Sequence, residues 1–303
     1  MRKASSILPL LLSTVAGTFG GALGIAWYVS SRVNPLPRRT YIDTYTFTPW
    51  ELGVPYEEIS LRTPDGLNLS GWWLPRPESR SVVIGCHGHT SFKADLLGIG
   101  TRTWRAGHNV LLFDFRGRGE SDPWPNTLVG REVQDLLTAA AYARERAPGA
   151  HIGTVGYSMG AVVSILAAVQ EPVIAALVVD SPFAVASEVV AASMRQVIRL
   201  PPEPLLAITD ALIERQHGYR LSQVRPIDVI SGLAPRPILF IHGTADSTIP
   251  VSHAHRLFAA AGQPKELWLC EGAEHCGAYF ADRNSYVNRV TAFFDQYLRS
   301  LEL

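Results

Sequence analysis

The sequence has few cysteines and no excess of either charge, and both shortages narrow the classes of protein that it can encode. Its 303 residues include three cysteines, without a C-x-x-C pair or a Cys/His spacing typical of metal sites. The odd number argues against a disulfide framework. The 27 Lys and Arg residues balance the 27 Asp and Glu residues, so no basic field would recruit nucleic acid. No repeat or low-complexity segment is present.

Charge is also missing from a long run near the N-terminus. The stretch "ILPLLLSTVAGTFGGALGIAWYV", from Ile7 to Val29, carries no charged residue. A helix needs about 20 apolar residues to cross the hydrocarbon core of a bilayer, and this run is long enough. Trp27 and Tyr28 are typical of the membrane–water interface. We therefore expect residues 1–40 to form a single-pass membrane anchor and a Pro-rich linker.

A cleaved signal peptide is the alternative for this segment. Ala22 and Gly24 offer a small-x-small cleavage pattern, but the apolar run continues beyond it to Val29, which favours the anchor. Arginines flank the run on both sides, so the charge pattern determines the orientation poorly. We favour an extracytoplasmic position for the folded domain. A chain that starts near Tyr41 is expected to be soluble, monodisperse and active, because the helix has no evident core to join.

Residues 41–303 alternate short apolar runs with amphipathic ones, which predicts an α/β domain. Continuous apolar runs such as "SVVIGC", "NVLLFDF", "HIGTVGY", "VIAALVVD" and "RPILFIHG" are typical of strands covered on both faces. Helical patterns lie between them, so we expect a mostly parallel, doubly wound sheet. The segment from about 183 to 229 is too long for a plain connection and is predicted to be a small helical cap.

One serine is placed as a nucleophile would be. Ser158 lies in "GYSMG", between the predicted strand "HIGTVGY" and the helical run "MGAVVSILAA". This strand–turn–helix context is what a G-x-S-x-G match requires, because the sharp turn lifts the hydroxyl clear of the sheet. The Met159 amide would then begin a helix beside the reacting carbonyl. A serine also needs a base, and the base needs a carboxylate.

Both partners follow in the chain at the ends of later predicted strands. Asp246 lies in "HGTADSTIP", and His275 lies in "EGAEHC" before the last helix. Asp180 also ends a predicted strand and is the rival acid. The order Ser, Asp, His is the order of the α/β-hydrolases.

These features together resemble one family. With "HGHT" and "DFRGRGESD" after the third and fourth strands, the chain from about Tyr56 onward resembles the α/β-hydrolase family. It looks most like the small hydrolases related to the catalytic domain of prolyl-oligopeptidase-type serine peptidases, including the membrane-anchored BEM46-like proteins. The resemblance implies that Asp246 is the acid, and that the His89 amide is a second oxyanion donor beside Met159. The His89 side chain is then incidental.

The expected activity is that of a serine hydrolase acting on an ester or thioester of a small acyl substrate. A peptidase or amidase is the alternative enzyme, and a membrane-anchored scaffold is the alternative from another class. No cofactor, metal or nucleic acid is expected, and the oligomeric state stays open. His253 and His255 are two positions apart and do not share a helix face, so we expect surface residues rather than metal ligands. His242 is expected to be structural, and Cys276 has no separate base.

Overall fold

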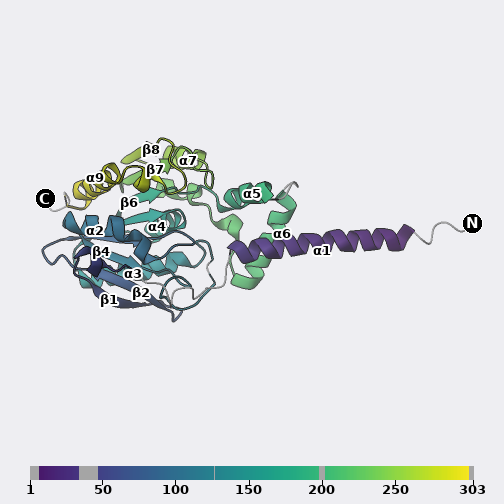
Figure 1. Ribbon diagram of the computed structural model, residues 1–303, viewed down its shortest axis with the longest axis horizontal. Coiled ribbons are helices and arrows are strands. Elements are labelled where there is room, and N and C mark those ends of the chain that lie inside the picture. Colours follow the sequence, from purple (N-terminus) through teal and green to yellow (C-terminus); the bar gives the residue numbers. More distant parts are fainter. Residues whose placement is uncertain (1–6, 34–46, 126, 198–201, 300–303) are drawn as a thin grey trace, which may run out of the picture.

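The computed structural model describes residues 7–33, 47–125, 127–197 and 202–299, and an eight-stranded sheet lies at its centre (Figure 1). The strand order is β1-β2-β4-β3-β5-β6-β7-β8. The antiparallel strands β1 (Glu57–Arg62) and β2 (Asn68–Leu74) form one edge. The parallel strands are β4 (Asn109–Phe113), β3 (Ser81–Cys86), β5 (His151–Tyr157), β6 (Ile174–Asp180), β7 (Ile238–Gly243) and β8 (Lys265–Cys270). The expected mostly parallel sheet is confirmed.

Helices cover both faces of the sheet, which explains the continuous apolar character of the central strands. Helices α2 (Leu97–Arg105) and α9 (Arg283–Phe294) cover one face, and α3 (Glu132–Arg146), α4 (Met159–Gln170) and α7 (Ser252–Ala260) cover the other. Along β3, Val82 and Ile84 pack with the α3 and α4 side, whereas Val83 packs with α9. Every residue of β3, β4 and β7 is buried. The shorter elements are η1 (Pro49–Leu52), η2 (Lys93–Leu96), α8 (Ala278–Ala281) and η6 (Asp295–Arg299).

The connection from β6 to β7 is helical and stands beside the sheet. It contains α5 (Ala186–Val197), α6 (Glu203–His217), η3 (Leu221–Gln223), η4 (Pro226–Asp228) and η5 (Ile230–Leu233). The segment predicted as a cap, 183–229, falls within it. Because parallel strands end at one edge of a sheet, the loops after β3, β5, β7 and β8 meet next to this helical segment.

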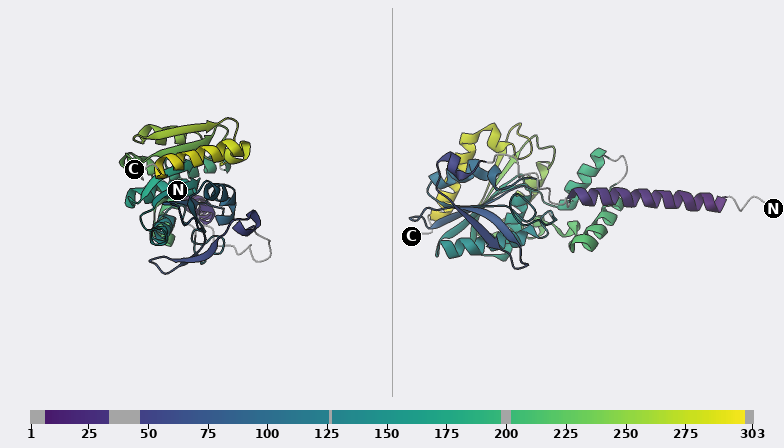
Figure 2. Two further views of the ribbon diagram at one scale, coloured as in Figure 1. Left: turned by 90° about the vertical axis from the view of Figure 1, so that its left-hand side faces the viewer. Right: turned by 60° about the horizontal axis from the view of Figure 1, so that its bottom comes forward.

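The N-terminal helix α1 (Ile7–Val33) runs out from the body, and its C-terminal part lies between α5 and α6 (Figures 1 and 2). Ala26, Ser30 and Val33 recur at helical spacing and are at most 9% exposed. The Ser30 hydroxyl donates to Gln216 Oε1 of α6 over 3.1 Å. The expectation that this helix has no core to join is therefore wrong, because the cap supplies one.

The opposite side of α1 faces outward. Leu23, Trp27 and Tyr28 are 45%, 60% and 50% exposed. Within the described ranges, no helix combines the length and the apolar character that crossing a membrane requires. The membrane anchor thus stays a prediction, and most of the expected linker, residues 34–46, lies outside the described residues.

Candidate active site

Ser158 occupies a strained turn between β5 and α4. Its φ is +53°, a value that residues with a side chain rarely adopt. The turn is tight, because a Cβ on Gly156 would collide with the backbone of Gly160, and a Cβ on Gly160 would collide with the carbonyl of Cys86. The Ser158 amide donates to the carbonyl of Asp180 over 2.8 Å, which ties the turn to the next strand. The two glycines of the motif are thus required by close approach of the backbone.

The structure brings the three predicted side chains into one hydrogen-bonded chain. His275 Nε2 lies 3.0 Å from Ser158 Oγ, and His275 Nδ1 lies 2.8 Å from Asp246 Oδ2. Asp246 follows β7 and His275 follows β8, so both stand at the edge where β5 delivers the serine. The arrangement has the geometry of a nucleophile, a base and a group that orients the base.

Asp246 is held as a carboxylate. Its side chain is fully buried, and its Oδ1 accepts from the amides of Thr248 and Ile249 at 3.0 and 2.7 Å. Burial alone would raise its pKa, but hydrogen bonds from His242, His275 and the Ile249 amide outweigh burial and hold the pKa well below its usual value. Asp246 is therefore ionised at neutral pH and can stabilise a charged His275.

His242 has a larger part in this site than its sequence context indicated. Its Nε2 lies 2.8 Å from the carbonyl of Ile249 and 3.3 Å from Asp246 Oδ2. It thus braces the loop that presents the acid. In the sequence, this role is indicated by the position of His242 at the end of β7, four residues before Asp246.

The rival acid, Asp180, is engaged elsewhere. It is fully buried, and its carboxylate accepts from the hydroxyls of Tyr286 and Ser181 at 3.0 and 3.1 Å. Burial raises the pKa of Asp180 to about 6. The Ser181 hydroxyl in turn accepts from the Cys276 amide over 3.1 Å, so this cluster supports the loop that carries His275. In the described residues, the carboxylate that accepts from His275 Nδ1 is that of Asp246.

The two predicted oxyanion donors lie beside the serine. Met159 is the first residue of α4, where amides have no partner within the helix. The loop that contains His89 passes close by, since a Cβ on Gly88 would lie 3.7 Å from Ser158 Cβ. The donor roles of both amides stay predictions.

The sequence suggested that the His89 side chain is incidental, and this expectation is wrong. Its Nε2 donates to the carbonyl of Val33, the last residue of α1, over 2.8 Å. Burial lowers the pKa of His89 to about 4, so the ring is neutral at pH 7. This contact joins the N-terminal helix to the loop after β3, 56 positions away in the chain.

Two cavities meet at Ser158, and they share Ser158, His89 and Thr248. The His275 pocket, of about 510 Å³, also contains His275, Tyr157 and Tyr279. The α1 pocket, of about 390 Å³, lies between α1 and α5 and contains Val29 and Val190. Both volumes are in the range of sites for small organic ligands.

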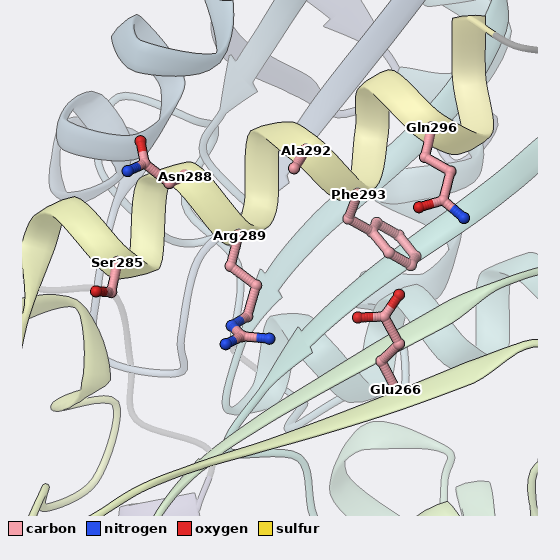
Figure 3. Close-up of a pocket in the computed structure, with 7 residues that line it drawn as sticks. All are labelled: Glu266, Ser285, Asn288, Arg289, Ala292, Phe293 and Gln296. Atoms are coloured by element: carbon pink, nitrogen blue, oxygen red, sulfur yellow. The ribbon is translucent and has the colours of Figure 1, made fainter.

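A third hollow lies away from these residues, between β8 and α9. Glu266 of β8 faces the side chains of Arg289 and Phe293 on α9 (Figure 3). No histidine or cysteine lines it among the described residues. It offers no nucleophile with a base, and we assign it no chemistry.

Several other predicted side chains have ordinary roles. Burial and the nearby Asp180 carboxylate raise the pKa of the Cys276 thiol well above its usual value, so a thiolate nucleophile is disfavoured. His255 is exposed, but His253 is 5% exposed and accepts from the Ala184 amide, so it is not the surface residue expected. No group of three potential metal ligands occurs in the part of the chain that the structure describes.

Comparisons with known proteins agree with the fold. Residues 77–218 match the family described as serine aminopeptidase, S33. The chain is 32% identical over 240 residues to the protein YqkD of Bacillus subtilis, covering 78% of each chain. It is 26% identical over 250 residues to YfhR of Escherichia coli K12, covering 80% of this chain and 79% of that one.

Among solved structures, the chain is similar to the Pyrococcus furiosus esterase Pf2001, with a TM-score of 0.71 and 25% identity. The match covers 86% of this chain and 97% of that one. The chain therefore belongs to the α/β-hydrolase family. It is a hydrolase, and Ser158 stands at the carboxyl ends of the parallel strands, where ligands bind in open α/β sheets.

Proposed function

We propose that this protein is a serine hydrolase that cleaves a carboxylic ester or thioester through an acyl-enzyme. The observation that carries the proposal is the chain Ser158, His275, Asp246, with hydrogen bonds of 3.0 and 2.8 Å at the junction of two cavities. A similar solved structure is that of an esterase.

The reaction starts with the Ser158 hydroxyl. His275 Nε2 takes its proton while Oγ attacks the carbonyl carbon, and Asp246 stabilises the imidazolium that results. The Met159 and His89 amides would hold the oxyanion, and one such donor is typically worth about 3 kcal/mol of transition-state stabilisation. When the carbon–oxygen or carbon–sulfur bond breaks, His275 returns the proton to the leaving group. Water, deprotonated by His275, then releases the acid and restores Ser158.

A peptidase or amidase is the second candidate, because the matched family is described as a serine aminopeptidase. An aminopeptidase needs an anionic group for the substrate ammonium. Of the described residues that line the two cavities, Asp95 is the one carboxylate. Its Oδ2 already accepts from the Ser91 hydroxyl at 2.5 Å and from the Phe92 amide at 3.3 Å. This engagement, with the apolar walls of the α1 pocket, favours the ester.

The experiment compares wild type with Ser158→Ala. Wild type should react with a fluorophosphonate probe and hydrolyse p-nitrophenyl acetate faster than aminoacyl p-nitroanilides. Ser158→Ala should lose probe labelling and drop in kcat by on the order of 10⁶-fold. Thermal unfolding should be nearly unchanged, because the hydroxyl is only partly buried. An active, labelled Ser158→Ala would contradict the nucleophile assignment, and an inert wild type would favour the scaffold.

The membrane anchor is a separate proposal. The uncharged run from Ile7 to Val29 and the exposed Leu23, Trp27 and Tyr28 support it. It would hold the hydrolase at a membrane surface, on the extracytoplasmic side.

A further inference from the structure

The nucleophile stands between two cavities of different character. Among the described residues, the α1 pocket has hydrocarbon walls from three parts of the chain: Val29 and Val33 of α1, Val190 and Met194 of α5, and Phe183 before α5. All five line it beside Ser158. Phe183, Val190 and Met194 are at most 6% exposed, so the inner wall is built into the fold.

The position of His275 distinguishes the two sides of the scissile bond. His275 lines the His275 pocket and does not line the α1 pocket. In acyl transfer the histidine protonates the leaving group, so the leaving group must lie within its reach. The leaving group therefore points into the His275 pocket. The acyl group, on the other side of the carbonyl carbon, extends toward the α1 pocket.

The chemistry of the α1 pocket suits a hydrocarbon chain. Its one charged side chain of fixed sign in the described structure is Arg32, which is exposed at the surface of α1 and donates to the Tyr28 hydroxyl over 3.2 Å. A polar or charged acyl tail would lose its water at the buried wall without gaining a partner there. An alkyl chain has no hydrogen bonds to water to lose, and its burial against the apolar wall is favourable.

The end of α1 is hydrogen-bonded to the loop after β3 that contains His89. The Val33 carbonyl belongs to the last turn of α1, where carbonyls lack a partner within the helix. It accepts from His89 Nε2, and His89 also supplies the predicted oxyanion amide. This hydrogen bond thus fixes the position of the α1 wall relative to the loop beside the reacting carbonyl.

Resting on the proposed function, we propose that the α1 pocket is the acyl-chain subsite and that the substrate is an ester or thioester of an unbranched fatty acyl group. The last turns of the N-terminal helix form one wall of the active site. The N-terminal helix is then part of the substrate-binding machinery.

The test uses the full chain in detergent and a series of p-nitrophenyl esters from acetate to decanoate, each below its critical micelle concentration. With wild type, kcat/KM should rise up to about fourfold per methylene, from about 0.8 kcal/mol per buried CH₂, until the pocket is full. Val29→Trp fills the pocket from α1. It should lower the ratio of kcat/KM for octanoate to kcat/KM for acetate by at least about tenfold relative to wild type.

The matched control is Leu23→Trp, which places the same side chain on the outward face of α1, where Leu23 is 45% exposed. It should keep the wild-type chain-length profile. An unchanged profile in Val29→Trp, or an equal change in Leu23→Trp, would overturn the proposal. If Val29→Trp also loses acetate hydrolysis, Met194→Ala decides: a larger pocket should move the optimum to longer chains, and an unmoved optimum overturns the proposal. Failure of wild type on every ester would instead refute the proposed function.

Discussion

Replacing Asp246 with asparagine separates the two candidate acids most sharply. In Asp246→Asn, one oxygen can still accept from the Thr248 and Ile249 amides. The new amide nitrogen then occupies the place of Oδ2, 2.8 Å from His275 Nδ1. An NH₂ group cannot accept from Nδ1–H, so it favours the tautomer that protonates Nε2. That tautomer cannot take the proton of Ser158.

The expected loss in kcat is about 10⁴-fold, or about 5 kcal/mol of transition-state stabilisation, as for the same change in other serine triads. Asp180→Asn should lower kcat by less than about tenfold. Its partners are the hydroxyls of Tyr286 and Ser181, which can rotate to suit an amide. Both variants change one oxygen to nitrogen in a buried carboxylate, so each is the control for the other.

The assay is steady-state hydrolysis of p-nitrophenyl acetate, with thermal unfolding by circular dichroism measured on the same preparations. Two folded variants with a larger drop in kcat for Asp180→Asn than for Asp246→Asn would refute the reasoning. The acid would then act from the end of β6. Equal, small drops would show that neither carboxylate orients His275.

Two more changes test the stability and the location of the protein. The pKa of Asp180 is raised to about 6 from 3.8, so the folded protein binds this proton more tightly than the unfolded chain does, and its contribution to stability is lost as pH rises from about 4 to about 6. The free energy of unfolding of Asp180→Asn, relative to wild type, should therefore grow by about 2 kcal/mol between pH 4 and 7 in urea titrations. A difference that does not change with pH would contradict the burial argument. The full chain should sediment with membranes and resist carbonate extraction, and its release by carbonate would count against the anchor. A chain that starts near Tyr41 should remain in solution. It should lose its preference for long acyl esters, because it lacks Val29 and Val33.

Local patterns were sufficient for most of the fold. The run "SVVIGC" coincides with β3, "HIGTVGY" with β5, and the helical run Met159–Gln170 with α4. These elements are buried on nearly every side, so their composition reflects their surroundings directly. The candidate site could be predicted from the sequence for a related reason. In a parallel sheet, residues just after the strands share one edge, and Ser158, Asp246 and His275 each follow a strand.

The sequence alone determined that an uncharged run precedes the α/β domain and that a serine, an aspartate and a histidine each stand just after a strand. Tertiary structure decided the relations between segments distant in the chain. Asp246 rather than Asp180 reaches His275 because the loops after β7 and β8 meet, while Tyr286 of α9 engages Asp180. The contact of Val33 with His89 likewise depends on how α1 packs between α5 and α6. No periodicity encodes such a contact, because a carbonyl at the end of a helix is bound through its backbone and leaves no trace in the choice of side chain.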